Sequence, residues 1–398
     1  MPSIRLLILA VCGVLLARGQ VRVDRENLRA EIAVSVPGGS LSIYLEPASN
    51  LILHTTSLYG LFDGQGAGYA LLDDVAAKRA VDPRILAALG GKDRRYSARG
   101  AANVFTPTFR AFLDGHLYEK PPDLAAWRAI APAVFGEALE EMWRGFYRDY
   151  WTRRFEALAS EFRQMSDNVR WAEMLGRMEQ LTGRRWRGEM RIFAVEATGK
   201  SALTFGRDVC IGTVGAGEDA GFVHEGLHLL LDEAWAKSPR IAALMADAGF
   251  RDRFWGARWA AMYEQAVVVL FETHLRGKRP RKPGMTQDEF LRLNLEGNLV
   301  GGFADIAMDT VGGYLKAPDG HFEDLMWRLV SRAEERRRAG QGVLGLNRRP
   351  LVHSSEAALS GCAVMLEQCG CRSGVAYSPA ERDPYGSLRR ACTRLFLR

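Results

Sequence analysis

The chain has 398 residues, of which 47% are hydrophobic and 25% are charged. This length and composition indicate two or three folded domains and exclude a disordered or collagen-like chain. The formal net charge of +6 is a weak excess for a surface of this size, so we expect no nucleic-acid partner.

Residues 1–19 have the pattern of a secretory signal peptide. Arg5 precedes an apolar run over residues 6–17, and small residues close the run. The run is too short to span a bilayer comfortably, so we expect no stable membrane anchor after cleavage; a buried N-terminal helix is the alternative. We therefore expect a secreted or periplasmic protein. Cleavage lowers the formal charge from +6 to +4, because Arg5 and Arg18 are lost.

Five cysteines remain after cleavage, and four of them lie in a C-terminal segment, residues 346–398. In an exported chain this cluster predicts two disulfide bonds, with three possible connectivities. A structural zinc knot is the alternative, but Cys369 and Cys371 are separated by one residue rather than by the two that are usual in such a site. The four are Cys362, Cys369, Cys371 and Cys392. Cys210 stands apart in an apolar, strand-like context, and we expect a buried thiol there.

Residues 20–185 are expected to form a β-hairpin followed by a largely helical region. Residues 31–36 and 41–45 carry alternating apolar side chains around a Gly-rich turn, which is typical of a hairpin. The residues that follow are mostly helix formers, and Gly183 suits the left-handed position that ends a helix. The sequence leaves open whether this region is a removable pro-segment or a permanent subdomain.

The pattern becomes β-rich near residue 190. Residues 190–197 and 202–212 favour strands and are separated by a turn. A Gly-rich connection leads into a long amphipathic helix, which we expect from about Asp219, a suitable N-cap, to just before Pro239.

Two later helices are also expected. Residues 259–275 have a helical pattern, and Thr286 and Glu289 have the spacing of a capping box at a helix start. Together the patterns predict an α+β fold that is mostly helical and contains a small mixed sheet. We divide the chain into residues 1–19, 20–185, 186–345 and 346–398.

Residues 224–228 read His-Glu-Gly-Leu-His. On a helix His224 and His228 are one turn apart and project from the same side, so both rings can reach one metal ion. Glu225 lies about 100° around the helix, where it can hold a water molecule without being a ligand. A separate apolar stripe would bury the helix and is formed by Val223, Leu227, Leu230, Leu231 and Ala234. A pair of hydrogen-bonded core histidines and a surface helix with an incidental glutamate are the alternatives.

A catalytic zinc ion needs a third protein ligand and an open position. Leu231 and Ala234 exclude the HExxHxxGxxH pattern, so the third ligand comes from elsewhere in the chain. Glu264 is our first candidate, because a carboxylate in a helix that is apolar on most sides needs a partner such as zinc. Glu272, two turns later on nearly the same face, is the rival. An ion pair between Glu264 and an arginine is the alternative without a metal.

The His-Glu-Gly-Leu-His motif with a downstream helical Glu264 resembles the gluzincin metallopeptidases, the thermolysin-like branch of the zincins. The resemblance extends over about residues 186–275 and suggests a bacterial secreted group. It implies a zincin-like region within residues 186–345, with the HExxH helix in the cleft and Zn²⁺ on His224, His228 and Glu264. It also implies an edge strand that binds an extended peptide substrate.

The sequence departs from the gluzincin pattern at Val268, where the family has an aspartate four residues after the Glu ligand. The contact of that aspartate with a histidine is therefore missing here or is supplied elsewhere. Asp232, one turn beyond His228, is a candidate for such an orienting role, although a solvent-facing acid would look the same.

The resemblance implies hydrolysis of peptide bonds by a zinc-activated water, with Glu225 as the general base that passes the proton to the leaving amine. A further donor would stabilise the oxyanion. Tyr314 is our choice over His321 and His353, and a purely structural role is the alternative for each.

We therefore expect a secreted zinc-dependent peptidase with a peptide or protein as its partner. A non-catalytic exported binding protein that retains the zincin frame is one alternative, and Val268 favours it. A metal-dependent amidase acting on cell-wall peptide is another. Glu225 favours catalysis, because a purely structural metal site has no use for a general base.

Overall fold

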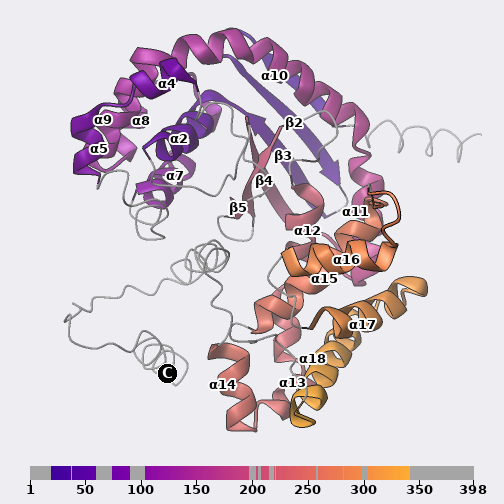
Figure 1. Cartoon of the computed structure of the whole chain (residues 1–398). Helices are drawn as coiled ribbons and strands as arrows, with labels where there is room; N and C mark the ends of the chain where they lie inside the picture. The colour runs from indigo at the N-terminus through magenta and orange to yellow at the C-terminus, as the bar shows by residue number, and fades with distance from the viewer. Residues whose placement is uncertain are drawn as a thin grey trace, which may run out of the picture.

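The computed structural model describes residues 19–36, 38–59, 74–89, 104–196, 203–204, 208–214, 219, 221–256, 259–280, 282–297 and 303–340. These residues are mostly helical and contain one small mixed sheet, which confirms the predicted α+β class (Figure 1). None of the helices described is long and apolar enough to cross a membrane. The signal sequence and the disulfides predicted from the sequence lie outside the described residues.

The sheet has six strands in the order β1-β2-β3-β4-β6-β5. They are β1 (Gln20–Asp24), β2 (Arg29–Val36), β3 (Gly39–Leu45), β4 (Gly188–Val195), β5 (Leu203–Thr204) and β6 (Val209–Thr213). Strands β1 to β3 are antiparallel, β3, β4 and β6 run parallel, and β5 lies antiparallel to β6 at the edge. The predicted hairpin is confirmed as β2 and β3, whereas the second β-rich run contains two short strands.

Burial along the strands explains their sequence patterns. Strand β2 buries alternate residues, including Ile32 and Val34, because successive side chains of a strand point to opposite faces of the sheet. The parallel strands β4 and β6 are buried continuously over residues 192–195 and 209–211. Parallel strands covered on both faces read as continuous apolar runs rather than as alternating ones.

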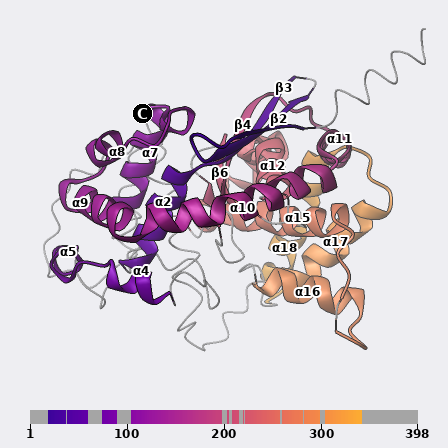
Figure 2. The same ribbon diagram turned by 90° about the horizontal axis from the view of Figure 1, so that it is seen from above.

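The helices fall into two groups along the chain. Those between β3 and β4 are α2 (Pro47–Leu58), α4 (Val75–Arg79), α5 (Pro83–Ala88), α7 (Thr106–Asp114), η3 (Leu117–Glu119), α8 (Leu124–Ile130), α9 (Ala133–Met142), η4 (Trp143–Tyr147), α10 (Arg148–Asn168) and α11 (Trp171–Thr182). Helix α10 packs on β1 and β2 and runs along the sheet (Figure 2).

The second group follows β6 and lies at the opposite end of the sheet from α4 to α9 (Figure 1). It comprises α12 (Phe222–Leu231), η5 (Glu233–Lys237), α13 (Pro239–Leu244), α14 (Ala248–Gly256), α15 (Trp259–Leu275), α16 (Gln287–Gly297), α17 (Ala304–Lys316) and α18 (Phe322–Arg338). The predicted helix over residues 259–275 is confirmed as α15. The capping box is also confirmed, because Glu289 Oε2 accepts from Thr286 N at 2.8 Å and Glu289 N donates to Thr286 Oγ1 at 3.2 Å.

The helix that carries the His-Glu-Gly-Leu-His motif is shorter than predicted. It begins after Gly221 rather than at Asp219, and it ends at Leu231 because Asp232 has a φ of 41°. The chain up to Pro239 then continues as the short 3₁₀ helix η5. A left-handed residue cannot continue an α-helix, so the predicted single helix is divided at this point.

Strands from both sides of the predicted boundary at residue 185 share one sheet, because β3 pairs with β4. Asn50 of α2 connects the ends of these two strands by hydrogen bonds. Its Nδ2 donates to the carbonyls of Glu46 at 2.8 Å and Ala194 at 3.2 Å, and its Oδ1 accepts from Glu196 N at 2.8 Å. Residues 20–45 therefore share one sheet with β4 and β6, the strands that precede the motif helix.

Glu46 is a buried carboxylate that caps α2, accepting hydrogen bonds from Ala48 N and Ser49 N. Burial raises its pKa from 4.5 to about 7, and the two backbone hydrogen bonds only partly oppose that shift. The folded protein therefore binds this proton more tightly than the unfolded chain does. The resulting destabilisation is absent below pH 4.5 and is complete above about pH 7.

Glu46→Gln removes this titration. We expect the variant to be more stable, relative to the wild type, at pH 8 than at pH 4, by about 3 kcal/mol in the free energy of unfolding. Urea unfolding at both pH values measures the difference, with Glu335→Gln on an exposed helical position as the control. An equal difference at the two pH values would contradict the prediction.

Gly183 ends α11 in the left-handed conformation that the sequence predicted, with a φ of 67°. A Cβ at this position would lie 1.8 Å from the carbonyl oxygen of Gly320, so the two chain segments could not keep their approach. Gly183→Ala is expected to lower the free energy of unfolding by about 2–4 kcal/mol.

The matched control is Gly176→Ala in the same helix. A Cβ at Gly176 meets no atom within 4 Å, and alanine is the better helix former, so this variant should be neutral or slightly stabilised. If urea unfolding gives the same change in the free energy of unfolding for both variants, the close approach of Gly183 to Gly320 does not contribute to stability.

Candidate metal centre

Helix α12 lies against α11 and α15 and buries the predicted apolar stripe as far as Leu231. Ala234, the last residue predicted in the stripe, lies in η5 instead and is exposed, because the helix ends before Asp232. The two helices α12 and α11 approach closely at Gly226, where a Cβ would lie 2.8 Å from the Cε of Met178. His224 and His228 lie beside the buried stripe with side chains 22% and 26% exposed. The two rings are therefore half-buried, and their centroids are 5.2 Å apart.

Each histidine is held through its Nδ1 atom by a carboxylate of α15. His224 Nδ1 lies 2.8 Å from Glu272 Oε2, and His228 Nδ1 lies 2.7 Å from Glu264 Oε1. An Nδ1–H bond to a carboxylate sets the ring orientation and leaves Nε2 to bind a partner on the other side of the ring.

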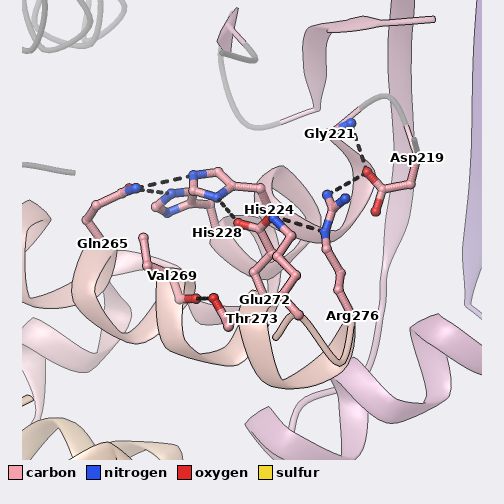
Figure 3. A network of polar contacts seen from close by, with 10 residues as sticks. Asp219, Gly221, His224, His228, Gln265, Val269, Glu272, Thr273 and Arg276 are labelled. Carbon is pink, nitrogen blue, oxygen red and sulfur yellow. Dashed lines mark hydrogen bonds and ion pairs between the residues drawn. The ribbon is translucent and has the colours of Figure 1, made fainter. Parts of the chain in front are cut away.

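The Nε2 atoms of both histidines face the side-chain amide of Gln265 (Figure 3). Gln265 Oε1 lies 3.0 Å from His228 Nε2, and Gln265 Nε2 lies 3.3 Å from His224 Nε2. Two imidazole nitrogens from successive turns of α12 thus converge on one place between α12 and α15.

The two carboxylates are themselves held by further polar groups. The second oxygen of Glu264 accepts from Trp235 Nε1 at 3.2 Å. The second oxygen of Glu272 lies 3.0 Å from Arg276 Nε and 2.9 Å from Lys278 Nζ. Arg276 continues the chain of contacts to Asp219, before the start of α12, at 2.7 Å (Figure 3). Such connected bonds hold the histidines in one orientation.

Two groups of the network have shifted pKa values. Burial alone would lower the pKa of His228, but the hydrogen bond and charge of Glu264 outweigh it and raise the pKa to about 9. Burial alone would raise the pKa of Glu272, but His224, Arg276 and Lys278 lower it to about 2. The first shift expresses the negative charge of Glu264 beside His228, and the second expresses the positive charges around Glu272.

Glu225 is not part of the hydrogen-bonded network around the histidines. It is 6% exposed, and its carboxylate makes no hydrogen bond or ion pair with any described residue. Its charge reaches His228 and also the thiol of Cys210 on β6, whose pKa is raised by burial and then by Glu225 and Asp219. Cys210 is buried and free, as the sequence predicted. The oxygen atoms of Glu225 still reach solvent, so the carboxylate can meet a water molecule or a substrate.

The structure places the two predicted third ligands differently from the expectation. Glu264 and Glu272 both lie on the Nδ1 sides of the histidines, away from the point where the Nε2 atoms converge. Glu264 therefore orients His228 in this structure and does not reach the Nε2 side. The contact that Val268 cannot make is supplied to His224 by Glu272, one turn further along α15.

Sequence reasoning missed Gln265. The signal was present, because Gln265 is a second polar residue beside Glu264 in a helix that is otherwise apolar over residues 266–271. An uncharged amide is a common residue on helix surfaces, so only its position against both histidines singles it out.

The predicted oxyanion donor lies elsewhere. Tyr314 is 3% exposed, its ring stacks on Phe271, and its hydroxyl donates to the carbonyl of Leu181. This hydroxyl serves to join α17 to α11, so Tyr314 has no part in the mechanism proposed below. His321 is exposed at the start of α18, and His353 lies outside the described residues.

Comparisons with protein-family models, curated proteins and solved structures find no match for this chain. Within the described part of the chain, no three His, Cys, Asp or Glu side chains come together as metal ligands. The chemistry of the site is therefore inferred from its own residues.

The residues present nevertheless fit a zinc ion. Imidazole nitrogen is a preferred zinc donor, and a carboxylate on Nδ1 is the usual support of a zinc-binding histidine. The charges also fit a divalent cation. With both histidines neutral, as metal binding requires, the network holds two cations, Arg276 and Lys278, and four carboxylates, which belong to Asp219, Glu225, Glu264 and Glu272.

Proposed function

We propose that this protein is a zinc-dependent peptidase in which His224 and His228 hold the metal through Nε2. The convergence of the two Nε2 atoms, each backed by a carboxylate on Nδ1, carries this proposal. Glu225 on the same helix is largely buried, is bonded to no described residue and adds a group suited to proton transfer.

Each residue of the site has a separate role in the proposed reaction. Glu272 and Glu264 hold the Nδ1–H group of each imidazole, so that Nε2 can bind the ion through its lone pair once His228 has given up its Nε2 proton. Glu225 accepts a proton from the attacking water and delivers it to the leaving amine. The zinc ion, when bound, supplies a Lewis acid that activates water and polarises the scissile carbonyl.

The proposed substrate is an extended peptide or protein segment. Strand β5 pairs with β6 and ends the sheet, and β6 leads directly into the segment before α12. An extended peptide can add to such an edge by main-chain hydrogen bonds, which would bring it to the beginning of the motif helix. With the predicted signal sequence, this favours a peptidase that acts outside the cytoplasm.

A non-catalytic binding protein receives less support. The substitution at Val268 suggested a lost contact to a histidine, but Glu272 makes a contact of that kind with His224. A purely structural metal site would also leave the burial of Glu225 unexplained. No described contact favours cell-wall peptide over other peptides, so the amidase remains an outcome of the test.

Metal analysis of the purified protein, paired with hydrolysis of a broad peptide library and of cell-wall peptide, tests the proposal. We expect one zinc ion per chain and cleavage of peptide bonds that a chelator abolishes. Protein that neither carries zinc nor takes it up would overturn the proposal. Zinc binding without cleavage of any substrate would identify the binding protein, and cleavage of cell-wall peptide alone would identify the amidase.

A further inference from the structure

The two carboxylates of α15 are committed to the far sides of the histidines. Glu264 uses one oxygen for His228 Nδ1 and the other for Trp235, and Glu272 uses one for His224 Nδ1 and the other for Arg276 and Lys278. Either carboxylate would have to give up these bonds before it could share an ion with the Nε2 atoms.

Gln265 occupies the place that the carboxylates do not reach. Its amide is the group that contacts both Nε2 atoms, and it follows Glu264 directly in α15. An ion bound to both nitrogens would lie within reach of the same amide, because all three atoms already approach one point. The amide oxygen has a free lone pair and needs only a rotation of the terminal amide to face the ion.

We infer that Gln265, through Oε1, is the third protein donor to the zinc ion, in place of the carboxylate that the motif leads one to expect. The inference rests on the proposed metal site. Glu264 and Glu272 then act as positioning residues for the two histidines. A neutral third donor leaves the full charge of the ion in the site, which lowers its affinity relative to a carboxylate site and strengthens its attraction for a substrate carbonyl.

Substitution of Gln265 tests the inference through metal affinity, without reliance on turnover. Zinc affinity is measured by competition with a chromophoric chelator, and the ligand set is followed by the absorption spectrum of the cobalt(II) form. Gln265→Leu removes the donor at similar volume and is expected to weaken zinc binding by about tenfold or more. Gln265→Glu is expected to strengthen it by about tenfold, because carboxylate oxygen is a charged zinc ligand. Both should alter the cobalt spectrum.

The controls separate folding from coordination. Gln180→Leu removes an exposed amide on α11 and should bind zinc as the wild type does. Thermal unfolding of each metal-free variant shows whether it has folded, and Gln265→Glu provides a gain of affinity that misfolding cannot imitate.

Two outcomes would overturn the inference. If both Gln265 variants bind zinc and cobalt as the wild type does, while Glu264→Gln loses the ion, then Glu264 is the third ligand and the proposed metal site stands. If the wild type itself binds neither metal, the proposed function fails and the inference fails with it.

Discussion

Replacement of Glu225 by glutamine is expected to abolish peptide hydrolysis while zinc remains bound. The amide keeps the size of the side chain but cannot accept a proton from water, and the loss of a general base lowers kcat by about 100-fold to 10,000-fold. Because Glu225 makes no hydrogen bond or ion pair with a described residue, the substitution breaks no structural contact that holds the histidines. It also removes a buried charge, so the variant should be at least as stable as the wild type.

The measurement combines kcat on a cleaved peptide with zinc content for the wild type, Glu225→Gln and the control Glu189→Gln. Glu189 is exposed on β4, so its substitution should change neither quantity. Full activity of Glu225→Gln would remove Glu225 from the mechanism. Loss of zinc together with activity would instead assign Glu225 to metal binding.

The second large effect concerns His224. Zinc that binds only the folded wild type should stabilise it by about 4 kcal/mol at a free concentration of 1,000 times its Kd. His224→Ala removes one of the two nitrogen donors and should abolish most of this gain. The change is suited to the test because Glu272 keeps its ion pairs with Arg276 and Lys278 when the imidazole is removed.

His228→Ala would be a poorer choice. Its partner Glu264 is 8% exposed and would retain only the hydrogen bond from Trp235, which leaves a buried charge without a cation. Urea unfolding with and without zinc, for the wild type, His224→Ala and the exposed control His116→Ala, gives the comparison. Equal stabilisation of all three proteins by zinc would exclude His224 as a ligand.

Local features of the fold could be predicted from the sequence because they depend on near neighbours in the chain. The β2–β3 hairpin follows from alternation around a turn, α15 from an unbroken helical pattern, and the start of α16 from the Thr286–Glu289 capping box. Gly183 ends α11 for the same kind of reason. The pairing of β3 with β4 was not predicted, because about 140 residues separate the two strands and no local pattern records which strands become neighbours.

For the candidate site, the sequence by itself determined that two histidines and a glutamate share one helix, because helical spacing alone places residues four apart on one side. It also indicated that α15 would supply a carboxylate to the site, because a carboxylate in an otherwise apolar helix needs a partner. Only the tertiary structure decided which nitrogen of each histidine meets which group. That choice depends on side-chain rotation and on the approach of α15 to α12, which bring Glu264 and Glu272 to Nδ1 and Gln265 to Nε2.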